Sequence, residues 1–154
     1  MLVAVAALPL FAGGGQEAEE EAKKDLLVGM DTGALVSLDP AAAYEVEGHW
    51  LLNNVYDTLV RFKPGSASEI EPGLATDWEV NGSTLVFTIR EGVKFSNGDE
   101  LTPEDVAYSL KRVVALEKSP SWILTQFGVT EDSVSAAGNN VYIEMDKPYS
   151  PQLV

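Results

Sequence analysis

The pair Asn81-Gly82, which stands between two strand-like runs, constrains the fold of this sequence more than any other feature. Asn-Gly between alternating runs is the strongest short-range signal for a β-hairpin. The run that follows, residues 84–90, places Leu85, Phe87 and Ile89 on one face. The sequence therefore predicts an antiparallel hairpin with an apolar face.

A helix is predicted to begin directly after Thr102. Thr102 is a suitable N-cap, Pro103 suits the first helical position, and Glu104 and Asp105 meet the positive end of the helix dipole. The positions of this helix that are expected to face the core are Val106, Leu110, Val113 and Val114. This capping role is a better explanation of the adjacent carboxylates than an acid/base pair.

Several further elements complete a mixed pattern of strands and helices. Strands are predicted at 26–30 and 60–63, a shorter helix begins at Ser119-Pro120, and a second hairpin joins 134–136 to 141–145. Between the first two strands, Asp39-Pro40 predicts a turn. A helix is expected within residues 44–59, with one apolar face formed by Val46, Trp50, Leu51, Val55 and Leu59. The predicted fold class is mixed α/β with mostly antiparallel strands.

The N-terminal end of the chain differs in character from the rest. Residues 1–12 are uncharged and almost wholly apolar, which suits the apolar part of a secretory signal peptide; a buried core segment is the alternative. Residues 13–25 are rich in glycine and acidic side chains and are expected to be a linker, or else a short solvated helix. Glycines rather than a Cys follow residue 12, so no lipid anchor is predicted.

Charge and composition exclude several classes of function. The chain carries 10 basic and 24 acidic side chains, for a net charge of −14, so no nucleic-acid partner is expected. It has no Cys and one His, which excludes thiolate sites and a His-rich metal site within these residues. His49 is expected to be a packed or half-exposed side chain, and no nucleophile elbow or phosphate-binding loop occurs. The sequence therefore predicts neither an enzyme nor a cofactor.

Residues 31–46 form the remaining candidate for a binding segment. They join the first predicted strand to the first predicted helix, where loops often carry binding groups on a rigid scaffold. Tyr44 can stack and form hydrogen bonds, and Glu45 can meet a cation. An ordinary connection is the alternative interpretation.

The order of these features resembles the N-terminal part of the extracytoplasmic solute-binding proteins that serve peptide ABC importers. The resemblance covers residues 26–154 and rests on blocks in the family's order, of which the block at 83–113 is the most specific. The blocks are LLVGM (26–30), SLDP (37–40), NNVYDTLVRF (53–62), EIEPGLATDWEV (69–80), STLVFTIREGVKFSNGDELTPEDVAYSLKRV (83–113) and VYIEMDKPYSP (141–151).

This resemblance implies the N-terminal portion of a two-lobed periplasmic-binding-protein fold. Residues 26–46 are expected to begin the ligand-binding first lobe, and residues 47–154 to form an inserted scaffold domain that is truncated at its return to that lobe. The second lobe, and the acidic group that holds a peptide's amino terminus, are expected beyond Val154. The chain is therefore expected to be an N-terminal fragment.

The implied function is capture of short peptides outside the cytoplasmic membrane and delivery to an ABC permease, by a monomer without a cofactor. Ligand contacts carried over by position are Ala43, Tyr44, Glu45 and Val46, which would supply backbone bonds and one side-chain contact to an extended peptide. The resemblance leaves open a nickel chelate or an oligosaccharide as the solute. A secreted scaffold or interaction module that binds no solute is the alternative function.

Overall fold

The computed structural model describes residue 29 and residues 31–148. The strands are β1 (Val60–Phe62), β2 (Ile70–Pro72), β3 (Ala75–Asn81), β4 (Thr84–Ile89), β5 (Val134–Ala137) and β6 (Asn140–Glu144). The helices are α1 (Val46–Leu52), α2 (Pro103–Ala115) and α3 (Trp122–Thr125), with 3-10 helices η1 (Ser119–Ser121) and η2 (Glu131–Ser133). The predicted signal peptide, linker and strand at 26–30 lie outside the described residues, apart from Gly29.

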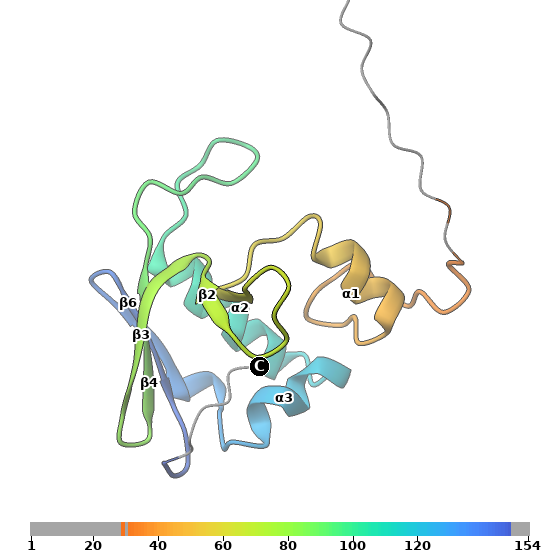
Figure 1. Cartoon of the computed structure of the whole chain (residues 1–154). Coiled ribbons are helices and arrows are strands. Elements are labelled where there is room, and N and C mark those ends of the chain that lie inside the picture. The colour runs from red at the N-terminus through yellow and green to blue at the C-terminus, as the bar shows by residue number, and fades with distance from the viewer. Residues whose placement is uncertain (1–28, 30, 149–154) are drawn as a thin grey trace, which may run out of the picture. The chain divides into compact units, whose positions relative to one another are not determined.

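Four strands form one antiparallel sheet in the order β3-β4-β6-β5, which confirms the mixed, antiparallel fold class (Figure 1). Both predicted hairpins are present: β3 and β4 meet at Asn81-Gly82, and β5 and β6 meet at Gly138-Asn139. Gly82 and Gly138 have φ values of +65° and +57°, a conformation that glycine adopts without steric cost. The second hairpin inserts β6 beside β4, with Phe87 opposite Val141.

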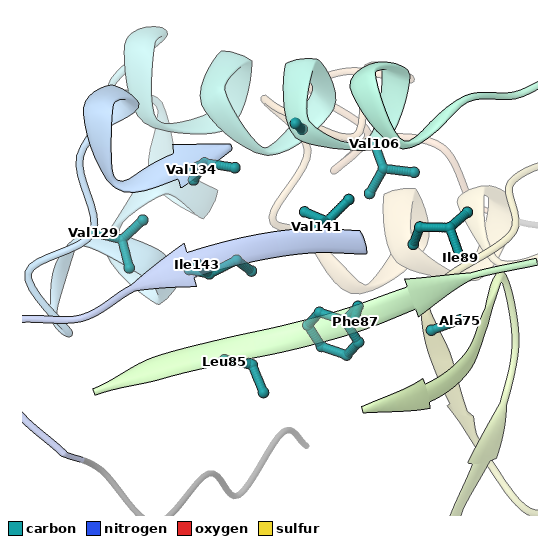
Figure 2. Packing of buried hydrophobic residues seen from close by; sticks show 10 residues of the cluster. Ala75, Leu85, Phe87, Ile89, Val106, Val129, Val134, Val141 and Ile143 are labelled. Carbon is teal, nitrogen blue, oxygen red and sulfur yellow. The ribbon is translucent and has the colours of Figure 1, made fainter. Parts of the chain in front are cut away.

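The hydrophobic core lies between this sheet and α2, which packs on β5 and β6. Figure 2 shows Val106 pointing from α2 toward Val141 on β6 and Ile89 on β4. The predicted apolar face of β4 is buried: Leu85, Phe87 and Ile89 are 5%, 3% and 2% exposed. Burying these large side chains is the main stabilising contribution to this part of the chain.

Helix α2 begins as predicted. The Thr102 hydroxyl accepts the Asp105 N–H, and the Asp105 carboxylate accepts the Thr102 N–H, which together form a capping box. On the predicted core face, Val106 is buried, Leu110 and Val114 pack against the core, and Val113 is half-buried. The shorter helix after Lys118 consists of η1 and α3 and ends before Gly128, as expected.

Strands β1 and β2 form a separate two-stranded sheet, of which only β1 was predicted. β2 has three residues and ends at Pro72, so it carries too short a pattern to be recognised from sequence. Gly73 follows directly and lets the chain pass close to β1: a Cβ at this position would lie 2.3 Å from the Thr58 carbonyl oxygen.

The prediction for residues 44–59 is wrong in its extent and in its buried face. The helix α1 ends at Leu52, and the Asn54 side chain donates a hydrogen bond to the Trp50 carbonyl oxygen at 2.7 Å. Val46 and Val55 are 80% and 77% exposed, and Trp50 is also exposed. Gly48 and Leu52 are the buried residues of α1 instead. Asn side chains compete with the helical backbone pattern, so the helix ends before a continuous apolar face can form.

Within the described residues, no helix is long and apolar enough to span a membrane.

Candidate functional site

Residues 31–46, here called the site loop, lead into α1 and contain the four candidate ligand contacts. The turn within this loop is organised by Asp39, as predicted from Asp39-Pro40. The Asp39 carboxylate accepts the Ala41 N–H at 3.0 Å, and its carbonyl oxygen accepts the N–H groups of Ala42 and Ala43 at 2.9 and 2.8 Å. The Ser37 hydroxyl accepts the Asp39 N–H at 3.0 Å. Asp39 therefore fixes the backbone directly before Tyr44.

The Glu45 carboxylate folds back onto the site loop. Its Oε1 accepts the N–H groups of Val36 and Ser37 at 2.8 and 3.2 Å, and its Oε2 accepts the Tyr44 N–H at 2.9 Å. These bonds favour the ionised form and lower the pKa of Glu45 to about 2, with the Tyr44 N–H as the largest cause. Gly48 makes room for this arrangement, because a Cβ there would lie 2.9 Å from Glu45 Oε1.

The four candidate residues divide into two pairs. Ala43 is 1% exposed, and Glu45 is half-buried with its carboxylate bonded to the loop's own amides. Tyr44 and Val46 are 45% and 80% exposed and present their side chains to solvent. Along this segment, residues that hold the backbone in place alternate with residues whose side chains are exposed. The exposed pair is the one that can contact a ligand by side chain.

Tyr44 lies among other aromatic side chains. Its ring makes an edge-on contact with Trp122 at a centroid distance of 6.2 Å and with His49 at 6.5 Å. Trp122 is the first residue of α3 and was not singled out in the sequence, because 78 positions separate it from Tyr44. His49 lies beside this contact and is exposed, where a packed or half-exposed side chain was expected.

Arg112, near the end of α2, was also missed by sequence reasoning. Its Nη1 and Nη2 donate to Oδ1 and Oδ2 of Asp39 at 2.7 and 2.5 Å, across 73 positions of sequence. This two-point ion pair lowers the pKa of Asp39 to about 2 and raises that of Arg112. No local pattern in the sequence signals a contact over such a separation.

A groove of about 390 Å³ lies where the site loop, α1 and α2 meet. It has both polar and apolar lining residues, which include Ala41, His49, Tyr56, Asp57 and Arg112. No group of three or more His, Cys, Asp or Glu side chains suited to a metal ion occurs in the part of the chain that the structure describes. None of the candidate contacts at 43–46 lines this groove, whose mixed polar and apolar lining is of the kind that binds small molecules.

Relatives in sequence include two Bacillus subtilis proteins named for peptide binding. The dipeptide-binding protein DppE of Bacillus subtilis is 37% identical over 87 residues, which are 55% of this chain and 16% of that protein. The oligopeptide-binding protein OppA of the same organism is 33% identical over 119 residues, which are 72% of this chain and 21% of that protein.

The fold is similar to that of the murein tripeptide binding protein MppA of Escherichia coli, with a TM-score of 0.66 and 27% identity. That match covers 74% of this chain and 25% of the solved chain. The chain therefore spans about a quarter or less of the length of these relatives.

Residues 69–154 match the family model described as the middle part of the bacterial extracellular solute-binding proteins, family 5. This match covers more than half of the sequence and includes β2 through β6, which form most of the core described above. The candidate contacts at 43–46 precede the matched residues. The chain belongs to family 5 of the bacterial extracellular solute-binding proteins.

Proposed function

We propose that this chain acts in the solute-binding subunit of an ABC importer, which captures short peptides outside the cytoplasmic membrane and delivers them to a permease. The observation that carries this proposal is the similarity, in sequence and in fold, to proteins named for binding dipeptides, oligopeptides and a murein tripeptide. Capture requires no covalent step, so the chain acts as a binding protein and not as an enzyme. It works as a monomer.

The two parts of the chain have different roles in this proposal. Residues 47–154 serve as a scaffold domain, which fits the position of the core between α2 and the sheet formed by β3 to β6. Residues 26–46 begin the ligand-binding lobe, and the site loop is the described part of it. The loop's backbone is held by its own carboxylates, which gives a ligand a defined surface to bind.

The peptide is proposed to lie in extended form along Ala43, Tyr44, Glu45 and Val46. Tyr44 and Val46 are exposed and supply the side-chain contacts, with the Tyr44 ring held edge-on by Trp122. Ala43 and Glu45 keep the backbone in place, because the first is buried and the second bonds three loop amides. Extended peptides are commonly recognised through backbone bonds with side-chain pockets at alternate positions.

The test uses the native gene product, purified from the exported fraction of its host and titrated by calorimetry. The probes are Ala-Ala-Ala, a nickel–histidine chelate and maltotriose, because these represent the solute classes left open by the sequence. Binding of the tripeptide alone supports the proposal. Binding of the chelate or the sugar alone, or of no probe, overturns the assignment to peptides.

A matched pair of variants tests the site. Tyr44→Ala should weaken tripeptide binding by roughly tenfold, in line with the loss of one aromatic contact at a binding surface. Phe95→Ala is the control, since Phe95 is 44% exposed, nearly the same as Tyr44 at 45%, and lies in another loop. Equal weakening by both variants, or none by Tyr44→Ala, would contradict the placement of the ligand on residues 43–46.

A further inference from the structure

The link between the site loop and α2 is unusually specific. Arg112 and Asp39 meet through two parallel hydrogen bonds, at 2.7 and 2.5 Å, with side chains that are 37% and 34% exposed. A two-point guanidinium–carboxylate pair fixes direction as well as distance, because both groups are planar. The pair therefore sets the orientation of Asp39 relative to the helix.

Within the residues that the structure describes, the other hydrogen bonds of the site loop run between its own residues or into α1. The loop also touches α3 through the ring of Tyr44. The pair with Arg112 is thus the polar connection that joins this loop to the core-bearing part of the fold.

Asp39 also holds the backbone that leads to the proposed ligand contacts at 43–46. The same residue accepts the N–H groups of Ala41, Ala42 and Ala43, so its carboxylate and carbonyl oxygens set the backbone up to Tyr44. On the other side of the pair, α2 is held by its capping box and by Val106 and Ala107 in the core. Arg112 sits in the last turn of α2, where a positive charge is favourable.

We propose that Arg112 is a positioning residue for solute binding: through Asp39 it fixes the site loop, and with it residues 43–46, on helix α2. This inference has two halves. The structural half, that Arg112 holds the site loop in place, follows from the contacts above. The functional half, that this placement strengthens solute binding, rests on the proposed function. The scaffold helix thereby contributes to affinity from a position that does not itself contact the solute.

The structural half is tested without any ligand, on the native gene product, by amide hydrogen exchange measured residue by residue. Arg112→Gln should accelerate exchange at Ala41, Ala42 and Ala43 by about tenfold, the effect of losing one strong charge-assisted pair. Exchange in β4 and β6 should stay unchanged. Arg112→Lys keeps the charge and one hydrogen bond, so it should give a smaller acceleration.

Lys111→Gln is the matched control, because it removes the same charge one position earlier on α2 and should leave the loop amides unchanged. If Arg112→Gln accelerates loop and sheet amides equally, the residue stabilises the whole fold and the proposal is wrong. It is equally wrong if the loop amides do not respond, or if Lys111→Gln gives the same result.

The functional half is tested on the native gene product with Ala-Ala-Ala. Arg112→Gln should weaken binding several-fold while Arg112→Lys recovers part of the loss, and Lys111→Gln should bind normally. A native protein that binds no peptide would overturn the proposed function, yet the exchange result would still decide whether Arg112 positions the loop. If Arg112→Gln binds the tripeptide normally although its loop amides exchange faster, Arg112 has no role in solute affinity.

Discussion

Two regions of the molecule are stabilised by different kinds of interaction: one is the sheet with α2, and the other is the site loop with α1. The first buries large apolar side chains, such as Phe87 at 3% and Val141 at 0% exposure. The second buries two alanines and Leu52, while Val36 and Val46 are each 80% exposed. In place of a large core, it uses carboxylates that accept backbone N–H groups, among them Asp39 and Glu45, and one ion pair.

This difference indicates how the stability of each region depends on pH. Burial of apolar area is indifferent to side-chain ionisation, whereas carboxylate–amide bonds depend on the charge of the acceptor. The site loop should therefore respond to pH and to single polar substitutions that leave the sheet intact. A binding loop with lower local stability than its scaffold is also a common arrangement.

The largest effect is expected from removing a core side chain. Phe87→Ala should lower the free energy of unfolding by about 3–5 kcal/mol, because it leaves a cavity between α2 and the sheet. Urea unfolding followed by circular dichroism measures this change. Val80→Ala, on the same hairpin but at 37% exposure, is the control and should cost less than about 1 kcal/mol. Similar losses for the two variants would mean that the sheet does not depend on this core.

Acid should separate the two regions. The pKa values of Asp39 and Glu45 are lowered to about 2 from ordinary values of 3.8 and 4.5, so their ionised forms favour the folded loop. This contribution is fully present above the ordinary values and is lost as the pH falls through about 2. Amide NMR signals of Ala41 and Tyr44 should change in this range before those of Val141.

The double variant Asp39→Asn, Glu45→Gln is the control for this titration, because it lacks the two carboxylates that accept the N–H groups of Ala41 and Tyr44. The Ala41 and Tyr44 signals of this variant should lose the pH response that the unmodified chain shows over the same range. Loop and sheet signals that change together in the unmodified chain would show that the two regions unfold as one unit, against the comparison drawn here.

The smallest effect is expected at the surface of the two-stranded sheet. Arg61 Nε lies 2.8 Å from Glu71 Oε1, and the two side chains are 66% and 29% exposed. Exposed pairs of this kind contribute little, so Arg61→Gln should change the free energy of unfolding by less than about 1 kcal/mol. Chemical denaturation checks this. A larger loss would mean that an ion pair can stabilise this fold without the second hydrogen bond that Arg112 makes.

The elements of the sheet and α2 were largely predictable because their signals are local. Asn81-Gly82 specifies its hairpin within two residues, and Thr102 with Pro103 and Asp105 specifies the start of α2 within one turn. The predicted class and the family were confirmed for the same reason. Each of these patterns carries its own physical cause and needs no knowledge of distant residues.

The site was less predictable because its contacts are long-range. Helical spacing of Val46, Trp50 and Val55 predicted a buried face, but that inference assumed a covering layer that the described residues do not place there. Arg112 and Trp122 reach the site loop only through the tertiary fold. Residue types and spacing identified the loop as a candidate binding segment, but they did not indicate its contacts with Arg112 and Trp122. The ligand contacts at 43–46 remain a prediction.

The insertion of β6 between β4 and β5 has a consequence for the order in which the sheet can assemble. Thr88 and Asn140 share a hydrogen bond across 52 positions, so one edge of β4 stays unpaired until residues 140–144 join the sheet. The first hairpin and α2 need only local contacts and can form early. Completion of the sheet waits for a strand of five residues near the end of the described chain. Until that strand joins, the open edge of β4 is a point at which partly folded chains can associate with one another.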